Sequence, residues 1–305
     1  MMKTDYAVAQ YEKACDLLPG RIMPMALNLP EEYMARVEEI RLRIGRPVHL
    51  ALPEGEHPLQ QTRVTREDLE FVLDRATEFS RYTASETLRA GYVTAEGGFR
   101  IGLCGTILST SGRTDGIKEI SSLSIRIPRI PEDIARPVFP KLLRDGVPVS
   151  TMIISPPGGG KTTLLRDLVR LVSDGSELCQ PLRVSLVDER GEIAAMYRGC
   201  PQLPVGRQTD VMDGCEKASA IPMLLRAMSP QVIAVDEVAL RADVDALSAA
   251  ANCGVILFAT AHGASLTDLK ARPVFRDLLA RGVMERAVIV EGRGVRRSYR
   301  VEDIQ

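Results

Sequence analysis

The segment VSTMIISPPGGGKTTLLR, residues 149–166, decides the fold of the second half of this chain. Its first six residues are apolar and largely β-branched, which predicts a buried strand of a parallel sheet. A proline–glycine stretch, 155–160, ends that strand, and Lys161-Thr162-Thr163 opens an amphipathic helix. Strand, glycine-rich loop, Lys-Thr and helix in this order are the signature of a phosphate-binding P-loop.

The residue types of this loop predict a nucleotide site. Glycines let backbone N–H groups turn inward onto phosphate oxygens, and the helix N-terminus adds the positive end of its dipole. We expect Lys161 to lie between the outer phosphates and the Thr162 hydroxyl to ligate Mg²⁺. Ser155 stands where the pattern has its first glycine, a position that mainly shapes the turn. The predicted nucleotide-binding residues are Pro157, Gly158, Gly159, Gly160, Lys161, Thr162 and Thr163.

The composition is that of a globular chain long enough for two domains. It has 305 residues, of which 45% are hydrophobic and 26% charged. The net charge of −1 gives no reason to expect binding to nucleic acid or to an anionic membrane. The six cysteines form no CxxC pair, and without a cleavable leader they are expected as reduced thiols of a cytoplasmic protein. The longest apolar runs have the length of strands, so no integral membrane segment is expected.

Three parts follow one another along the chain. Residues 1–130 predict a small α+β domain, with helices before residue 36, hairpins at 38–52 and 91–103, a helix at 65–79 and a strand at 121–129. Residues 131–148 contain four prolines and predict a semi-rigid linker. In residues 149–305, strands at 184–188, 232–236 and 255–260 alternate with helices at 218–228, 243–252 and 274–281, before a hairpin at 286–301. This alternation predicts a parallel sheet with right-handed crossovers.

Two acidic motifs follow predicted strands, at the sheet edge where parallel sheets bind ligands. Asp236 is expected to hold Mg²⁺ through water, and Glu237 to polarise the attacking water. The alternative for this pair is a helix cap. Asp188 and Glu189 belong to a stretch of five residues, 188–192, that holds three carboxylates and an arginine. Such a stretch suits contact with a metal-bound water and with phosphate, or else forms a surface ion-pair cluster.

A histidine and two arginines complete the candidate site. His262 ends the predicted strand that begins at residue 255, and we expect it to hydrogen-bond the γ-phosphate and report its loss, in preference to a core or capping role. A triphosphate needs more positive charge than Lys161 supplies, and P-loop enzymes add an arginine at the γ-phosphate. The P-loop domain offers Arg207 and Arg226 for this role, and the first domain offers Arg100, Arg126 and Arg129. Arg126 and Arg129 lie in an alternating strand, where Arg126 can project while its aliphatic neighbours pack. The alternative is an ordinary solvated strand face.

Long stretches of the chain resemble the stage III sporulation protein AA family, which belongs with the type II and type IV secretion ATPases. The resemblance is carried by VDERGEIAAMYRGCPQLPVGRQTDVMDGCEKASAIPMLLRAMSPQVIAVDEV (187–238), EEIRLRIGRPV (38–48), GYVTAEGGFRIGLCGT (91–106) and SLSIRIPR (122–129). Asp188 and Glu189 fall on the acidic box of these relatives, and His262 falls on their histidine box. The chain departs from the family at Ser155 and at 238–240, where Ile-Gly is expected after the acidic pair.

This resemblance implies a RecA-like P-loop ATPase domain over residues 149–305, preceded by a smaller PAS-like domain, with ATP and Mg²⁺ as cofactors. It also implies a homo-oligomeric ring, a hexamer, in the cytoplasm. The implied partners are membrane proteins of the channel between mother cell and forespore, through which the ring would associate with the membrane. In secretion ATPases the first domain closes over the nucleotide and donates arginines. SIRIPR (124–129) resembles that donor strand, so Arg126 or Arg129 is expected to reach nucleotide in a cleft between domains.

Three classes of function remain open. In the leading one, a secretion-type motor, the catalytic residues are Glu237, Asp236, Lys161, Glu189, His262, Arg126 and Arg129, and the metal ligands are Thr162, Asp236 and Asp188. A ring-type nucleic-acid translocase would need a basic channel lined by aromatic residues, and 4% aromatic residues with no tryptophan argue against base stacking. A nucleotide-gated scaffold would bind ATP and hydrolyse very little of it. A single-turnover assay separates that scaffold from a motor.

Overall fold

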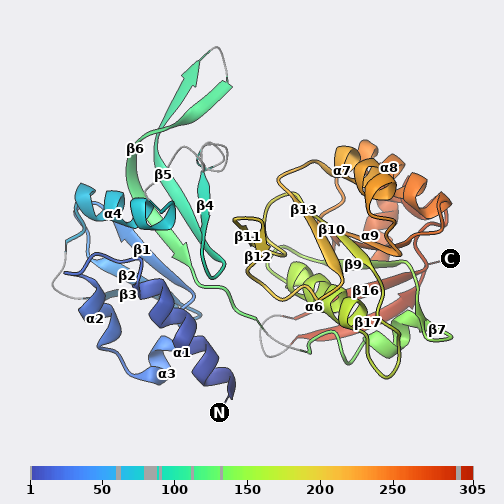
Figure 1. The fold of residues 1–305 in the computed structure, drawn as a ribbon, viewed down its shortest axis with the longest axis horizontal. Helices are drawn as coiled ribbons and strands as arrows, with labels where there is room; N and C mark the ends of the chain where they lie inside the picture. The colour runs from blue at the N-terminus through green and yellow to red at the C-terminus, as the bar shows by residue number, and fades with distance from the viewer. Residues whose placement is uncertain are drawn as a thin grey trace. The chain divides into compact units, whose positions relative to one another are not determined.

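The computed structural model describes residues 2–59, 63–78, 88, 91–110, 113–130, 133–292 and 297–304. Its contacts divide the chain into two units (Figure 1). Unit 1 comprises Met1–Arg129 and Ala195–Gln202, and unit 2 comprises Ile130–Ala194 and Leu203–Gln305. The division of the sequence into a first domain, a linker at 131–148 and an ATPase domain stays a prediction.

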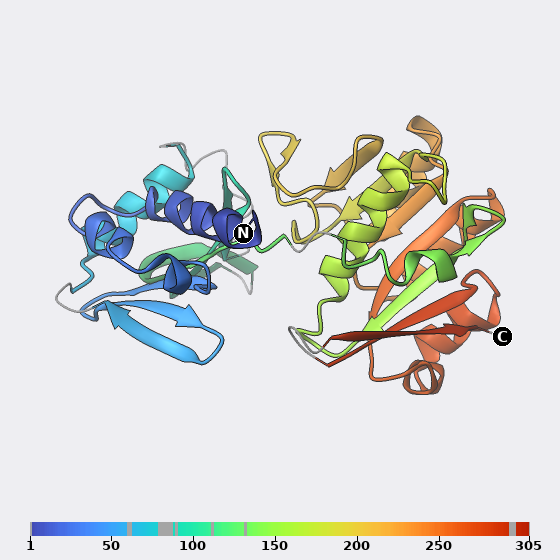
Figure 2. The ribbon, with the colours of Figure 1, turned by 90° about the horizontal axis from the view of Figure 1, so that it is seen from below.

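Unit 1 is built on a six-stranded antiparallel sheet whose strand order is β3-β2-β1-β6-β5-β4. Helices cover one face of this sheet (Figures 1 and 2). The elements of unit 1 are α1 (Met2–Cys15), α2 (Met23–Leu27), α3 (Glu31–Met34), β1 (Glu39–Arg43), β2 (Val48–Leu52), β3 (Gly55–Leu59), α4 (Arg66–Ala76), β4 (Tyr92–Ala95), β5 (Phe99–Thr110) and β6 (Arg113–Arg126).

Local sequence accounts for most of unit 1. Strand β1 alternates between half-buried and fully buried residues, so that Ile40 and Leu42 enter the core. Helix α4 starts with the predicted capping box, in which Thr65 N–H donates to Asp68 Oδ2 at 2.7 Å. Strand β3 was not expected, because four of its five residues are exposed and it contains a proline, which only an edge strand tolerates. The predicted α+β class is confirmed, and the PAS-like assignment stays a prediction.

A short hairpin from the second half of the sequence belongs to unit 1. It consists of β11 (Met196–Tyr197) and β12 (Cys200–Pro201), which pair in antiparallel fashion. Gly97 N–H donates to Gln202 Oε1 at 2.8 Å, and the Tyr197 hydroxyl hydrogen-bonds to Glu78. Two-residue strands carry no periodic signal, so this hairpin could not be predicted from the sequence.

Unit 2 is a seven-stranded sheet of order β13-β10-β14-β15-β9-β16-β17, parallel except for β17 at one edge. Its first elements are η1 (Phe139–Leu142), β7 (Leu143–Arg144), β8 (Val147–Pro148), β9 (Thr151–Ser155), α6 (Lys161–Asp174), β10 (Val184–Asp188), β13 (Thr209–Asp213) and α7 (Lys217–Ala227). They are followed by β14 (Val232–Val235), α8 (Arg241–Asn252), β15 (Ile256–His262), α9 (Leu266–Ala271), α10 (Pro273–Ala280), β16 (Arg286–Glu291) and β17 (Ser298–Asp303).

The central strands of unit 2 are buried along their whole length because helices cover both faces of the sheet. Met152 and Ile154 of β9 belong to the core that α7, α8 and α10 complete. Side chains alternate along a strand, so the fully buried Ile153 between them faces the opposite side, where α6 packs against β9 and β15 (Figure 2). The predicted parallel sheet is confirmed. The edge strand β13 and the short helix α9 were missed.

Parallel strands end at a common edge, and this brings the predicted motifs together. The phosphate loop follows β9, the two acidic motifs follow β10 and β14, and His262 ends β15. All four strands are neighbours in the order β10-β14-β15-β9. Among the described residues, no helix has the length and apolarity needed to cross a bilayer.

Candidate nucleotide site

The phosphate loop, residues 156–160, connects β9 to α6 and takes its shape from glycine. Gly158 has φ +72° and Gly160 has φ +95°, in the left-handed region that other residues rarely adopt. Gly160 caps α6, so the half-buried Lys161–Thr163 segment forms the first turn of that helix. Backbone N–H groups in a first turn have no partner within the helix, which leaves them available to an anion.

Ser155, the departure from the P-loop pattern, is accommodated inside the loop. It is fully buried at the end of β9, and its hydroxyl donates to Pro156 O at 2.8 Å. A Cβ on Gly159 would lie only 2.1 Å from Ser155 Oγ. Glycine is therefore required at position 159 as long as serine occupies position 155.

The carboxylate of Asp236 is held by the neighbouring strand β15. Only 7% of Asp236 is exposed, and its Oδ1 accepts hydrogen bonds from Thr260 Oγ1 at 2.8 Å and from Glu237 N–H at 3.0 Å. The N–H groups before α8 instead donate to Asp243, for example that of Leu240 at 3.0 Å. Asp243, and not the acidic pair, therefore caps the helix that follows β14.

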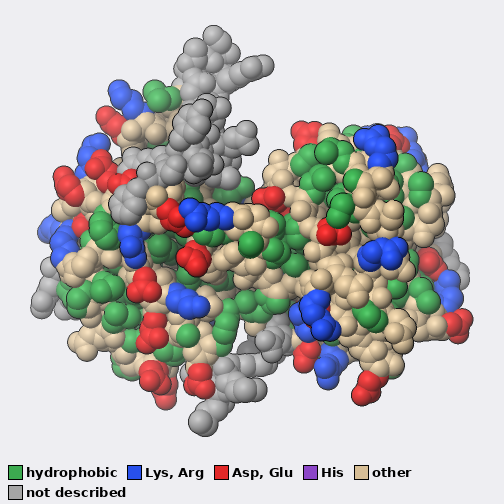
Figure 3. Space-filling model, in the orientation of Figure 1, with side chains coloured by type: hydrophobic (Ala, Val, Ile, Leu, Met, Phe, Trp, Pro, Cys, Tyr) green, Lys and Arg blue, Asp and Glu red, His purple; other side chains and the backbone are tan. Residues whose placement is uncertain are grey.

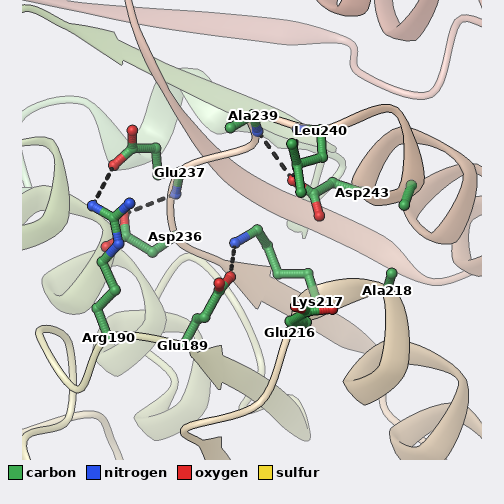
Figure 4. Close-up of a pocket in the computed structure, with 11 residues that line it drawn as sticks. Glu189, Arg190, Glu216, Lys217, Ala218, Asp236, Glu237, Ala239, Leu240 and Asp243 are labelled. Atoms are coloured by element: carbon green, nitrogen blue, oxygen red, sulfur yellow. Dashed lines mark hydrogen bonds and ion pairs between the residues drawn. The ribbon is translucent and has the colours of Figure 1, made fainter. Parts of the chain in front are cut away.

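Glu237 is held between a histidine and an arginine. Its Oε1 lies 3.2 Å from His262 Nε2, and its Oε2 lies 3.3 Å from Arg190 Nη1 (Figure 4). Its backbone has φ +22°, a conformation that costs a non-glycine residue on the order of 1–3 kcal/mol and that recurs at active sites. With 24% of its side chain exposed, the Glu237 carboxylate has both fixed partners and access to water.

His262 connects the acidic pair to the phosphate loop. It is the last residue of β15, directly opposite Ser155 of β9 in the parallel register. Its Nε2 contacts Glu237, whereas its Nδ1 is buried and makes no hydrogen bond within the part of the chain that the structure describes. Its predicted contact with a γ-phosphate stays a prediction.

The Asp188 carboxylate holds together the loop that follows it, residues 189–194. This fully buried carboxylate accepts backbone N–H groups of Glu192 at 2.9 Å, Ile193 at 3.0 Å and Ala194 at 2.8 Å. Arg166 of α6 supports the same loop by donating to the carbonyl oxygens of Ile193 and Glu192. Burial raises the pKa of Asp188 against the opposing effect of the three N–H donors, and burial lowers the pKa of Arg166 to about 10. Metal ligation by Asp188 stays a prediction.

Glu189 is engaged by a buried lysine. Lys217, the first residue of α7, is 6% exposed, and its ammonium forms an ion pair with Glu189 (Figure 4). The pair lines a cavity of about 230 Å³ together with residues of both acidic motifs and the starts of α7 and α8. Because the lysine is buried, this contact differs from the surface ion-pair cluster considered as the alternative for Glu189.

Metal binding is compatible with the donors at this edge of the sheet. Within the described ranges, no group of three or more His, Cys, Asp or Glu side chains is arranged to hold a metal ion. A P-loop Mg²⁺ needs fewer protein ligands, since phosphate and water oxygens complete its octahedron. Thr162 and Asp236 offer the hard oxygen donors that this ion prefers, and their role as ligands stays a prediction.

The two arginines of unit 1 have partners within that unit. Arg126 lies 3.3 Å from Glu39 Oε1, and Arg129 donates to Arg36 O at 2.6 Å and lies 3.8 Å from Glu38 Oε1. Both side chains are more than 40% exposed, as on a solvated strand face. Their predicted contact with nucleotide stays a prediction.

Sequence reasoning missed four side chains of this region: Arg166, Lys217, Thr260 and Arg297. Arg297, directly before β17, lies with its guanidinium against the phosphate loop, since a Cβ on Gly160 would be 2.5 Å from Arg297 Cζ. No motif marks any of the four, because each acts on a partner remote in sequence. Thr260 alone had a usable signal, since it shares a strand face with His262 two residues on.

The fold of this chain is similar to that of two solved structures, an ATPase and a pilus retraction motor. The ATPase DotB of Legionella pneumophila superposes with a TM-score of 0.57 at 15% identity, over 88% of this chain and 76% of DotB. The pilus retraction motor PilT superposes with a TM-score of 0.58 at 17% identity, over 88% of this chain and 80% of PilT. This likeness confirms the predicted RecA-like P-loop fold of the second domain.

Sequence comparison identifies the family. The chain is 41% identical to "Stage III sporulation protein AA" of Bacillus subtilis (strain 168), over 86% of this chain and 85% of the relative. The family model described as "Sporulation stage III, protein AA" matches residues 9–301. The match covers nearly the whole chain, including both units and the phosphate loop. The chain therefore belongs to the stage III sporulation protein AA family.

Proposed function

We propose that this chain is a Mg²⁺-dependent ATPase of the secretion-ATPase type, an ATP-driven motor. The observation that carries the proposal is the position of the Glu237 side chain. Its carboxylate stands at the same sheet edge as the phosphate loop, one strand away, and His262 of the intervening strand contacts it at 3.2 Å. A scaffold that only binds nucleotide would have no use for a strained, positioned carboxylate at this point.

The loop fits a nucleotide's phosphates. Gly158 and Gly160 have left-handed backbone conformations, which let successive N–H groups turn toward one anion, and a Cβ on Gly158 would meet open space. Lys161 opens the helix with a cationic side chain, and the buried Nδ1 of His262 is a polar atom without a partner among the described residues. Bound Mg²⁺ would supply positive charge to the phosphates and would be held by Thr162 and Asp236.

The chain's own residues then divide the work of hydrolysis. Glu237 accepts a proton from the attacking water, which its partly exposed carboxylate can reach. His262 and Arg190 fix the two oxygens of that carboxylate, so its orientation does not depend on solvent. Thr260 keeps the Asp236 carboxylate directed by a hydrogen bond across the sheet. These fixed partners reduce the reorganisation needed when the proton moves.

Membership of the family supports a proposal about the biological setting. We propose that the subunits form a hexameric ring that energises a membrane channel complex between mother cell and forespore, as the resemblance to secretion ATPases implies. On the face drawn in Figure 3, basic and acidic side chains of the described residues are interspersed. The net charge of −1 for the whole chain likewise gives no reason to expect a nucleic-acid translocase, which would need a continuous basic track.

The first test is nucleotide binding. Replacing Lys161 by alanine removes the cation between the outer phosphates, so we expect ATP affinity to fall at least tenfold, about 1.4 kcal/mol. Calorimetry with the full chain and Mg²⁺ measures this directly. Lys141→Ala is the matched control, since it removes the same charge from an exposed position of unit 2 and leaves affinity unchanged. Unchanged ATP affinity in Lys161→Ala would contradict the assignment of residues 156–160 as a phosphate-binding loop.

A second measurement addresses assembly and turnover together. If hydrolysis requires a ring, the ATPase rate per subunit rises with protein concentration and then levels off. A single-turnover assay at the plateau separates the motor from a scaffold, because a scaffold retains bound ATP. A rate per subunit that is independent of concentration contradicts the ring, and slow single turnover contradicts the motor.

A further inference from the structure

The pairing of β9, β16 and β17 in unit 2 places Arg297 next to the phosphate loop. Strand β16 pairs with β9 in parallel, so its carboxyl end lies at the same sheet edge as the loop. Strand β17 returns antiparallel, with Ser298 opposite Glu291, the last residue of β16. Arg297 directly precedes Ser298. It therefore stands at the loop edge of the sheet, in the same subunit as the loop.

The guanidinium lies flat against the last glycine of the loop. A Cβ added to Gly160 would be 2.5 Å from Arg297 Cζ, 2.5 Å from Nη2 and 2.8 Å from Nη1. Three atoms of the planar group are thus nearly equidistant from one point above the α-carbon of Gly160. Gly160 caps α6 and precedes Lys161, so Arg297 is at the mouth of the loop where the helix dipole is positive.

Arg297 lacks the partners that its neighbours on the same strand pair have. Arg300 forms ion pairs with Glu291 and Glu302, and Arg286 forms one with Asp303. Across the described residues, no ion pair involves Arg297, and its buried Nε has no hydrogen-bond partner. A partly buried guanidinium without an anion is unfavourable, and so is its position beside Lys161 at a helix N-terminus.

We propose that Arg297 binds the phosphate chain of the nucleotide, in cis, as a second cation beside Lys161. The proposal rests on the nucleotide site proposed above and adds a ligand to it. The guanidinium presents paired N–H donors that match two phosphate oxygens, which the point charge of Lys161 does not. Each subunit thereby holds its own nucleotide with two cations from unit 2.

Contact with phosphate is favoured over contact with the base. The atoms nearest the guanidinium belong to Gly160, the loop residue next to Lys161, and loop residues contact phosphates in P-loop proteins. An arginine that stacks on adenine would act through the face of its guanidinium and would be indifferent to the phosphates. Inorganic tripolyphosphate has no base, so it separates these two modes of binding.

The experiment measures binding of MgATP, MgADP and inorganic tripolyphosphate to the full chain by calorimetry. The variant is Arg297→Met, which keeps the aliphatic stem and removes the charged group. In Arg297→Met we expect the affinity for all three ligands to fall about tenfold. Arg297→Lys should recover part of that affinity, because lysine restores the positive charge but not the paired N–H donors of the guanidinium. Arg300→Met makes the same change three residues further on, within β17; it is the matched control and should leave all three affinities unchanged.

Three outcomes would overturn the proposal. Tighter binding by Arg297→Met would mean that the side chain occupies the loop and must leave before nucleotide enters. Weaker ATP binding with unchanged tripolyphosphate binding would assign Arg297 to the base. Unchanged affinity for every ligand in both Arg297 variants would remove Arg297 from the site.

Lys161→Ala, measured in parallel, distinguishes failure of this proposal from failure of the nucleotide site itself. If it loses ATP affinity while the Arg297 variants do not, the nucleotide site stands and only the role of Arg297 fails.

Discussion

The carboxyl ends of β10 and β14 carry the same dipeptide at the same level of the sheet. At the end of each strand the sequence is Val-Asp-Glu, at 187–189 and 235–237, and the two valines are paired in the parallel register. The two aspartates are almost fully buried, at 0% and 7% exposure. Judged by sequence and position alone, either pair can serve as the acidic pair of a P-loop enzyme.

Their partners differ completely. After β10 the chain folds back, so that the backbone N–H groups of residues 192–194 donate to the Asp188 carboxylate. Lys217 forms an ion pair with Glu189. After β14 the chain turns at the strained φ of Glu237, which leaves that carboxylate between His262 and Arg190 with access to water. The same dipeptide thus organises a loop at one strand end and presents a partly exposed carboxylate at the next.

This contrast indicates that backbone N–H donors determine whether a carboxylate at a strand end holds a loop together or can take part in proton transfer. A carboxylate saturated by its own loop stabilises the folded state, whereas one held only by side chains remains free to accept a proton. We therefore expect substitutions at the end of β14 to reduce turnover and substitutions at the end of β10 to reduce stability.

The largest effect is expected at Glu237. Glu237→Gln keeps the shape of the side chain but cannot accept a proton from water, so turnover should fall by about 10²- to 10⁴-fold, with MgATP affinity retained. Steady-state ATPase assays and calorimetry measure the two quantities. Glu189→Gln makes the same change at the end of β10 and should reduce turnover by less than about tenfold. Equal losses in the two variants would contradict the contrast between the strand ends.

The next effect is on stability, at Asp188. In Asp188→Asn one oxygen becomes an NH₂ group that faces backbone N–H donors, so buried donors lose their acceptor at a cost of about 2–3 kcal/mol. Denaturant unfolding of the full chain, followed by a probe in unit 2, measures the loss. Asp236→Asn is the matched change on β14 and should cost less, because one amide oxygen can still accept from Thr260. If Asp236→Asn proves the more destabilising, Asp188 does not organise its loop.

The sequence predicted the sheet and the positions of the motifs because both depend on local patterns. The runs that became β9, β14 and β15 are mostly apolar, and the burial of their central residues follows from that. Strand β13, Thr209–Asp213, was missed because it is a half-exposed edge strand with aspartates at its second and last positions. Such a strand is defined by its pairing with β10, which no local pattern reveals.

The division of roles between the two acidic pairs could not be predicted, because it depends on residues remote in sequence. The partner of Glu189 lies 28 positions away, at Lys217, and the side chain that directs Asp236 lies 24 positions away, at Thr260. Arg297 reaches the phosphate loop only through the order of strands in the sheet. Motifs give the kinds of residue in a site, whereas the strand order gives their partners.

The smallest effect is expected at Thr260, which connects β14 to the strand beside the phosphate loop. Its hydroxyl donates to Asp236 Oδ1 at 2.8 Å and accepts Glu237 N–H at 2.9 Å. Thr260→Val keeps the volume and removes both bonds, so we expect a loss of stability of about 1 kcal/mol. Turnover should fall about tenfold, and half-maximal activity should need more Mg²⁺, because Asp236 loses its fixed orientation.

A titration of ATPase activity with Mg²⁺ separates an effect on orientation from a simple loss of packing. Thr260→Ser restores the hydroxyl in a smaller side chain, so it should recover the Mg²⁺ requirement even if some stability is lost. Ser185→Ala is the matched control, since this buried hydroxyl of β10 has no hydrogen-bond partner among the described residues and its removal should change neither quantity. A Thr260→Val variant that loses stability but keeps the wild-type Mg²⁺ requirement would show that Asp236 is oriented without its neighbour, and the strand end of β14 would then resemble that of β10.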